Sequence, residues 1–364
     1  MKNDKSMPAN EAGQRTKGTH KETYAGAGVN IARKTSVISN IRRMAALTLG
    51  PQVLSGVGFF GSMYEFRGYK DPVLVSSVDG VGTKTKLASA LNRHDTVGID
   101  IVNHCVDDII TCGAKPLFFL DYVGVGKVVP ERMEAIVKGL SVACKDAGCA
   151  LIGGEIAEMP SVYGEDDYDL VGFIVGVVEK GKIIRGENIV EGDSVIGLRS
   201  SGLHTNGYTL ARRVLGDTSQ ELDVYYPSLK MTLGDALLEP HRSYYKDLKP
   251  VFSMLKGIAH ITGAGIIGNV GRILPKGLAV DIESGSWGVP PLFKLIQERG
   301  NIETREMYRV FNMGLGMILM CSPQMESRLR KVLPDAEVIG KVVKPRGRVR
   351  AIIDGVGYRS DKVR

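Results

Sequence analysis

The sequence predicts a mixed α/β protein of two domains. Its 364 residues are 43% hydrophobic, which is enough apolar material for two ordinary cores. From residue 71 onward, short β-branched runs alternate with helical stretches, as they do in mixed α/β domains. The stretch GKIIRGENIVEGD at 181–193 is charged and rich in turn residues, and a new strand follows it, which indicates a domain boundary.

The elements of the first part follow in chain order. Residues 1–22 have almost no large apolar side chains, so we expect a disordered basic tail, with structure beginning near Tyr24. The first domain is expected at 23–180, with helices at 101–112 and 132–147. Its strands are expected at PVLVSSVD, PLFFLDYV and DLVGFIVGVVE.

The second domain is expected at 181–345, and it again places glycine loops after strands. It begins with the strand SVIGLRS, and Asn206 with Gly207 is expected to open an amphipathic helix. Residues 346–364 are expected to form a basic C-terminal segment.

The net charge of +7 comes from the ends of the chain. Residues 1–43 and 341–364 together carry +12, so the body between them carries −5. A nucleic-acid groove needs basic residues interleaved with aromatics on the folded face, so we expect no nucleic-acid partner. The longest apolar run is far too short to span a membrane, and the polar N-terminus lacks the apolar core of a signal peptide. These features predict a cytoplasmic protein with no membrane partner.

The five cysteines form no CxxC pair and lie mostly among apolar residues. They are therefore expected to be reduced structural thiols, and a metal cluster is not expected.

The first candidate site is SSVDGVGTKTK at 76–86. A β-branched strand ends in Asp79, a glycine loop with Gly80 and Gly82 follows, and Lys84 comes next. A carboxylate at a strand end beside flexible backbone and a lysine can hold a metal ion and a polyphosphate together. The spacing is not that of a P-loop. A hairpin turn with a solvated lysine is the alternative, and these residues alone leave both open.

The second candidate is a series of acids: Asp100, Asp107, Asp108, Asp121 and Glu155. Asp100, Asp121 and Glu155 each close or interrupt an apolar segment, and Asp108 is expected on the polar edge of a helix. An unpaired carboxylate buried in such a segment is costly, so each needs a cation or another partner. Magnesium takes oxygen ligands and shares them with substrate phosphates, so acids around one cleft predict a magnesium-nucleotide site. Taken singly, each acid could instead be a helix cap or a surface group.

The third candidate is SSGLHTNGYTLARRVL at 200–215. Small residues, His204 and then Asn206 precede an amphipathic helix, whose N-terminus offers backbone N–H groups to an anion. A histidine in that position is a candidate for general acid or base work, although a lone histidine is more often structural.

The fourth candidate is GAGIIG at 263–268, which has the glycine spacing of a dinucleotide-binding turn, with Asp281 and Glu283 downstream. The preceding strand would be only IAHIT, and the helix after Gly268 is a short NVGRIL with a further glycine. This context argues against NAD, whereas anion binding at a glycine turn that opens a helix remains open.

Taken together, these segments resemble the phosphoribosylformylglycinamidine cyclo-ligases, also called AIR synthetases. The resemblance runs from YAGAGVNI near residue 24 to EVIGKV near 341. Its motifs are SVDGVGTK, RHDTVGIDIV, DDIITCGAKP, FFLDY, LIGGEIAEMPSVY, SSGLHTNGY, HITGAG and EMYRVFNMGLGM. Two residues depart from the family pattern: Ile156 stands where many relatives have threonine, and Asp107 where many have asparagine.

The resemblance implies ATP-dependent ring closure of formylglycinamidine ribonucleotide, through phosphorylation of the formyl amide oxygen. It implies ATP and Mg²⁺, with K⁺ as a further candidate ion, and a small ribonucleotide substrate. It also implies a homodimer in which the N-terminal sheet pairs with that of a second copy to form a barrel, beside a C-terminal α/β domain. The site would lie in the cleft between the domains.

Carried over residue by residue, the resemblance implies a set of site residues. The catalytic residues would be His204, Asp108 and Asn206. Those that bind ATP would be Asp79, Gly80, Gly82, Lys84, Asp100, Gly153, Gly154 and Glu155. Those that bind the substrate would be Ser201, Gly202, His260, Thr262, Gly263 and Gly265. The metal ligands would be Asp79, Asp100, Asp108 and Glu155.

Other functions are weaker alternatives. Selenophosphate synthetase would have a reactive cysteine near its N-terminus, and none precedes Cys105; the hydrogenase-maturation dehydratase would end in a cysteine, whereas this sequence ends DKVR. Thiamine-monophosphate kinase is a further ATP user of the same superfamily. An NAD-dependent oxidoreductase depends on GAGIIG alone, and a non-enzymatic anion-binding module has no use for five acids.

Overall fold

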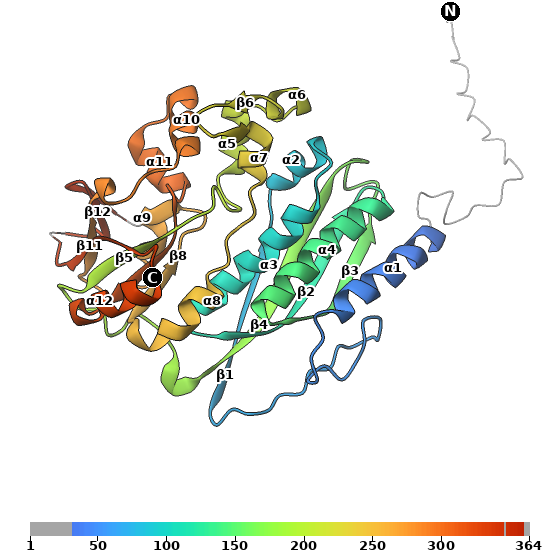
Figure 1. Ribbon diagram of the computed structural model, residues 1–364, viewed down its shortest axis with the longest axis horizontal. Coiled ribbons are helices and arrows are strands. Elements are labelled where there is room, and N and C mark those ends of the chain that lie inside the picture. The colour runs from blue at the N-terminus through green and yellow to red at the C-terminus, as the bar shows by residue number, and fades with distance from the viewer. Residues whose placement is uncertain (1–30, 346, 360–364) are drawn as a thin grey trace, which may run out of the picture.

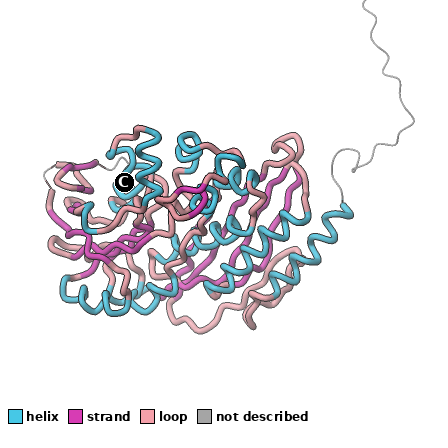
Figure 2. Tube along the Cα trace, turned by 45° about the horizontal axis from the view of Figure 1, so that its top comes forward, coloured by secondary structure: helices cyan, strands magenta, loops and turns pink. Residues whose placement is uncertain are grey.

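The computed structural model describes residues 31–345 and 347–359 (Figure 1). The predicted tail at 1–22 and the expected start near Tyr24 lie outside these residues. The described chain forms two α/β units, each built on its own sheet, as the sequence predicts (Figure 2). Within it, no helix is long and apolar enough to cross a membrane.

The first unit is a four-stranded sheet in the order β1-β4-β2-β3. Its strands are β1 (Pro72–Gly80), β2 (Lys115–Val125), β3 (Ala150–Glu158) and β4 (Tyr168–Glu179). Its helices are α1 (Ile31–Ala46), α2 (Lys84–Ala90), α3 (Asp95–Ile110) and α4 (Pro130–Ala147). The predicted strands and both predicted helices are confirmed, although α3 begins earlier than its apolar pattern indicated, with Asp95 in its first turn.

Helices α3 and α4 cover one face of this sheet, and α1 packs on α4 (Figure 1). The two covering helices approach closely because Gly98 and Gly139 face each other's backbone: a Cβ at Gly98 would overlap the Ile136 carbonyl, and one at Gly139 the Asp95 carbonyl. Along β1, exposed residues alternate with half-buried ones, and the exposed ones lie on the opposite face, which the described residues leave open. Helix α3 is thereby buried along most of its length.

The second unit is a seven-stranded sheet in the order β13-β12-β9-β11-β5-β10-β8. Its strands are β5 (Ser194–Arg199), β8 (Gly257–His260), β9 (Ala279–Ile282), β10 (Leu315–Cys321), β11 (Glu337–Val343), β12 (Ala351–Ile353) and β13 (Val356–Tyr358). A short ribbon is formed by β6 (Tyr225–Tyr226) and β7 (Met231–Thr232). In the seven-stranded sheet, the buried strands β5 and β10 lie side by side, and β8 forms the edge next to β10.

Eight helices surround the second sheet: α5 (Tyr208–Leu215), α6 (Ser219–Leu222), α7 (Leu233–Leu238), α8 (Tyr245–Leu248), α9 (Gly265–Val270), α10 (Pro291–Gly300), α11 (Thr304–Val310) and α12 (Pro323–Val332). Three 3₁₀ turns lie at Lys180–Lys182, Lys249–Met254 and Ser284–Ser286. The helix that Asn206 and Gly207 were predicted to open is α5, with Gly207 as its left-handed N-cap at φ 81°.

The second unit extends past residue 345, where the sequence predicted its end. Strand β12 pairs in parallel with β9, and β13 pairs with β12, so both complete the sheet. The Arg350 side chain is buried and donates hydrogen bonds to the carbonyl oxygens of Pro275, Leu278, Gly271 and Leu274. The basic composition of this segment concealed a buried guanidinium that ties strand β12 to the loop after α9.

Candidate functional site

The candidate site lies where helix α3 of the first unit meets two segments of the second unit. Asp100 accepts a hydrogen bond from the His241 backbone N–H at 2.7 Å, and Asp107 accepts one from the Tyr244 N–H at 3.0 Å. The Asn103 side chain donates to the His241 carbonyl at 2.6 Å. Three polar residues of one buried helix therefore hold the segment before α8 in place.

Lys84 and Asp100 form an ion pair at 2.7 Å, and neither side chain is exposed. The Lys84 ammonium also donates to the backbone oxygens of Glu239, at 2.8 Å, and His204, at 3.3 Å. Burial raises the pKa of Asp100, and Lys84 opposes that rise; burial lowers the pKa of Lys84, and Asp100 opposes that fall. The ammonium has three partners already, so Lys84 joins the two units rather than facing open space.

Asp79 and Asp108 present the accessible carboxylates of this site. Their side chains are 46% and 30% exposed. Asp79 pairs with His104 Nε2 at 2.9 Å, and Asp108 pairs with His260 Nδ1 at 2.8 Å and accepts from the Ser77 hydroxyl at 2.8 Å.

Both of these carboxyls are held in the ionised form. Burial alone would raise the pKa of each, but the hydrogen bond and charge of His104 outweigh it and lower the pKa of Asp79. The hydrogen bond from His260, with the charges of His260 and His104 and the Ser77 hydroxyl, lowers the pKa of Asp108 to about 2. Two anionic groups thus lie beside the glycine loop that follows β1.

His204 lies in the loop between β5 and α5, with its ring buried. The Ser201 N–H donates to His204 Nε2 at 3.2 Å, so that nitrogen carries no proton. Burial, followed by the charges of His260 and Lys84, holds the pKa of His204 well below its usual value. The ring stacks on His241 with a centroid separation of 3.9 Å. In this arrangement His204 is a neutral imidazole inside the loop.

A cavity of about 520 Å³ opens between the glycine loop after β1 and the start of α5. Gly82 and Thr83 line one side, and Asn206 and Gly207 line the other, with Arg213 contributing a positive charge and Glu306 a negative one. The two sides meet where the hydroxyls of Thr83 and Thr209 lie 3.2 Å apart. The first and third candidate segments of the sequence therefore form one anion-compatible cavity.

The GAGIIG segment forms a turn that leads into α9, a helix of six residues. The turn places Ala264 at φ 84° and Gly265 at φ 58°, and a Cβ at Gly265 would overlap the Tyr308 carbonyl. The Asn269 amide ties the turn together by donating to the carbonyls of Thr262, Gly263 and Gly265. A helix this short does not continue as the dinucleotide-binding helix that the glycine spacing resembles.

The same turn lies against the loop that precedes α5. A Cβ placed on Gly263 would come within 3.1 Å of Asn206 Oδ1, so the turn and the Asn206 side chain are in close contact. Ser201 and Gly202 lie in the loop that contains His204, and the Ser201 hydroxyl donates to the Pro240 carbonyl at 2.6 Å. The predicted substrate-binding residues are thus brought together from two distant parts of the sequence.

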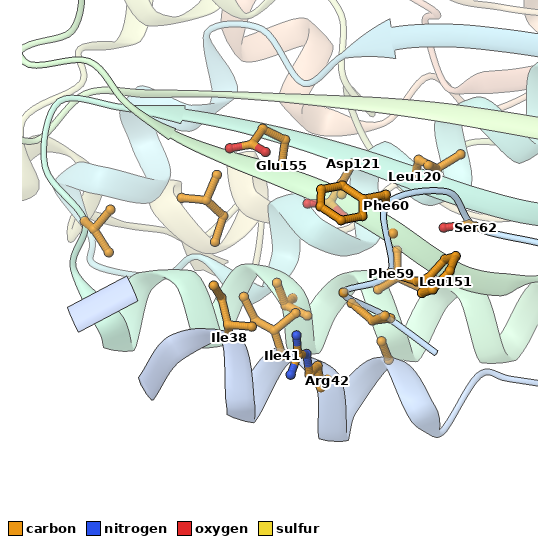
Figure 3. Close-up of a pocket in the computed structure, with 18 residues that line it drawn as sticks. Ile38, Ile41, Arg42, Phe59, Phe60, Ser62, Leu120, Asp121, Leu151 and Glu155 are labelled. Carbon is orange, nitrogen blue, oxygen red and sulfur yellow. The ribbon is translucent and has the colours of Figure 1, made fainter. Parts of the chain in front are cut away.

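The sequence predicted the acids around one cleft, but the structure separates Asp121 and Glu155 from Asp79 and Asp108. Asp121 and Glu155, with Gly153 and Gly154, line a separate cavity of about 650 Å³ beside α1 and Phe60 (Figure 3). The sheet register places Asp79, Gly172, Asp121 and Gly154 in one row, so Gly154 is three strand spacings from Asp79, or about 14 Å. Burial raises the pKa of Asp121 to about 7.

Two residues of the site belong to no predicted set: His104 and His241. His104 comes from α3, and its Nδ1 lies 2.5 Å from the Thr205 hydroxyl. His241 lies in the segment that α3 holds, and its ring is 1% exposed. The sequence has six histidines, and four of their rings come together here. Considering the histidines as one set is therefore the signal that could have found His104 and His241.

Family comparisons match both units. The family model described as the AIR synthase related protein N-terminal domain matches residues 64–178, and its C-terminal counterpart matches residues 190–352. A phosphoribosylformylglycinamidine cyclo-ligase of Geobacillus kaustophilus is 49% identical over 335 residues, which cover 90% of this chain and 97% of the relative. One of Thermoanaerobacter pseudethanolicus is 49% identical over 332 residues, covering 90% and 99%.

Solved structures with the same fold are more distant in sequence. A thiamine-monophosphate kinase from Stenotrophomonas maltophilia has a TM-score of 0.63 at 15% identity, covering 89% of this chain and 97% of that one. The hydrogenase maturation protein HypE in complex with ATP has a TM-score of 0.63 at 14% identity, covering 89% and 93%. At these identities the likeness establishes the shared fold alone.

Proposed function

The chain belongs to the phosphoribosylformylglycinamidine cyclo-ligase family, and from that premise we propose how its residues serve the family reaction. The enzyme closes the imidazole ring of formylglycinamidine ribonucleotide in purine biosynthesis, with consumption of ATP. The observation that carries this conclusion is 49% identity to a curated cyclo-ligase across 97% of that protein's length.

The chemistry sets the demands on the site. An amide oxygen is a poor leaving group, so it receives the γ-phosphoryl group of ATP. The amidine nitrogen then forms the new C–N bond, and the C–O bond breaks to release phosphate, leaving ADP and the aminoimidazole ribonucleotide. The protein must therefore align the amide oxygen with the phosphoryl group and neutralise negative charge.

We assign the magnesium ligands to Asp79 and Asp108. Both offer accessible oxygen atoms of ionised carboxylates, and one oxygen of each lies within 4.8 Å of the other. Magnesium typically takes one or two protein carboxylates and completes its shell with water and phosphate oxygens, which fits this pair. Asp100 is already paired with Lys84, and Glu155 lines the cavity beside α1, so neither residue is assigned as a magnesium ligand.

The phosphates of the nucleotide belong beside Asp79, at the loop of Gly80 and Gly82. The Gly80 N–H already donates to Asp79 Oδ1, so the backbone at Gly82 and the nearby start of α5 would supply the N–H groups for them. Gly153 and Gly154 line the separate cavity beside α1, so they would bind nucleotide only there. That cavity is a second candidate nucleotide site.

The substrate belongs against the two loops of the second unit. Ser201, Gly202, Thr262, Gly263 and Gly265 form this wall. Asn206 lines the 520 Å³ cavity and offers an amide that can orient the reacting groups.

His204 holds the loop around Ser201 in shape as a neutral imidazole, and His260 orients Asp108. These two are positioning roles, since each ring is buried.

A second copy of the chain would cover the open face of the first sheet. Leu74 and Val78, on one side of β1, are 63% and 62% exposed, and Phe173, the register partner of Val78, is 39% exposed. A row of exposed apolar side chains on an otherwise finished sheet is typical of an interaction surface. A homodimer through this face is the proposal, and Val78→Asp tests it: the variant should elute as a monomer, whereas unchanged dimer or a monomeric wild type would contradict it.

The activity test uses purified protein with formylglycinamidine ribonucleotide, ATP and Mg²⁺, with and without K⁺. ADP and the aminoimidazole product should appear in equal amounts, and neither should form without the ribonucleotide. ADP released at the same rate without the ribonucleotide would contradict the function.

A further inference from the structure

Three histidine rings form a triangle between the two units. His104, from α3, and His260, at the end of β8, have ring centroids 5.1 Å apart. His241, from the segment before α8, lies 5.5 Å from His104 and 5.3 Å from His260. One nitrogen of each ring lies within 4.8 Å of the others, so the three rings could hold one metal ion once they close to the zinc–nitrogen distance of about 2.0–2.1 Å.

All three rings are buried, and those of His241 and His260 have nitrogen atoms without a hydrogen-bond partner among the described residues. His104, His241 and His260 are 2%, 1% and 6% exposed. Among the described residues, His260 Nε2 and both nitrogens of His241 have no hydrogen-bond partner. A buried polar atom left unsatisfied costs about 1–3 kcal/mol. A neutral imidazole has one nitrogen lone pair, so His241 and His260 each offer one electron pair that a metal ion can accept.

Each ring also faces a carboxylate on one side. His260 Nδ1 binds Asp108, and His104 Nε2 binds Asp79. His241 Nε2 lies 3.3 Å from Asp107 Oδ2, although the angle is not that of a hydrogen bond. Metal-ligating histidines almost always have such a carboxylate or carbonyl partner, which orients the ring and strengthens the ligand.

His104 is the ring whose two nitrogens are both engaged. Its Nδ1 lies 2.5 Å from the Thr205 hydroxyl, whose oxygen must move away by rotation about the Thr205 Cα–Cβ bond before Nδ1 can bind a metal ion. His204 lies outside the set, because its Nε2 accepts from the Ser201 N–H while its ring stacks on His241.

We propose that His104, His241 and His260 bind one divalent transition-metal ion of the zinc class. Imidazole nitrogens suit zinc, cobalt, nickel and iron, whereas magnesium takes oxygen ligands, so this ion is distinct from one held by Asp79 and Asp108. Three histidines leave a fourth coordination position for water or a substrate atom. The site joins an element of the first unit to two of the second, and it does not depend on the proposed function.

The test measures metal binding by the full chain without a histidine tag. Chelator-treated protein is incubated with Zn²⁺ or Co²⁺ and desalted, and the retained metal is measured by mass spectrometry. Wild type should retain one ion per chain. His104→Gln and His241→Asn should each weaken retention by at least about tenfold. His94→Gln is the matched control, because His94 is a buried histidine bound to the Tyr168 hydroxyl in the first unit.

Wild type that retains no ion, or equal retention in wild type, His104→Gln and His241→Asn, would overturn the site. If a variant fails to fold, as judged by circular dichroism, the cobalt spectrum of wild type decides. Co²⁺ held by three imidazoles in a four-coordinate site gives intense visible bands. Weak bands, or displacement of Co²⁺ by excess Mg²⁺, would place the ion on oxygen ligands and reject the proposal. A catalytically inactive wild type that still binds Co²⁺ in this way would contradict the proposed function alone.

Discussion

Replacing Lys84 by methionine tests whether this residue joins the two units or contacts phosphate. The substitution leaves the Asp100 carboxyl fully buried, with the His241 N–H as its remaining partner. Removing one partner of a buried ion pair typically costs about 3–5 kcal/mol of unfolding free energy. We expect a loss of that size for Lys84→Met, measured by urea denaturation followed by circular dichroism.

Two controls make this result specific. Lys86 lies two residues away with its side chain 46% exposed and pairs with the exposed Asp167, so Lys86→Met should cost at most about 1 kcal/mol. The double variant Lys84→Met/Asp100→Leu removes both charges and should recover much of the loss. A Lys84→Met protein as stable as wild type, with a raised KM for ATP, would refute the structural role of Lys84 between the two units. It would support the phosphate contact that the sequence predicted.

Three further outcomes follow from the same geometry. Asp108→Asn should lower kcat at least about tenfold with the circular dichroism spectrum unchanged, because it removes a proposed magnesium ligand; wild-type kcat would reject the assignment. The folded pKa of Asp108, about 2, lies below its unfolded value, so its stabilisation is complete above pH ~4 and is lost as the pH falls toward 2. The stability difference between wild type and Asp108→Asn should therefore shrink over that range, and a constant difference in urea titrations would contradict it. Gly139→Ala should destabilise by about 1–3 kcal/mol because its Cβ meets the Asp95 carbonyl, whereas Gly148→Ala, with open space at a positive φ, should cost less; equal losses would count against the close helix contact.

Much of the fold was predictable because its signals are local. Short runs of β-branched and aromatic residues mark β1, β2 and β4, and Pro130 with Gly148 brackets α4. The end of the second unit was missed because Arg350 looks like a surface charge in the sequence, and only the folded chain supplies the four carbonyls that satisfy it.

The candidate site was predictable in its loops but not in its pairings. Motifs located Asp79, Asp108 and the loop of His204, which do meet. The sequence could not show that Lys84 is paired with Asp100 or that Glu155 lies in another cavity, because both facts depend on contacts between distant segments. His241 belongs to no motif, and its role depends on the position of α3.

The most direct test of the central claim follows the oxygen atom of the formyl amide. Substrate labelled with heavy oxygen at that position is converted by wild-type protein with ATP and Mg²⁺, and the released phosphate is analysed by mass spectrometry. Phosphorylation of the amide oxygen predicts that the label appears in inorganic phosphate in a one-to-one ratio with the aminoimidazole product. Label recovered in water, with unlabelled phosphate, would contradict the account.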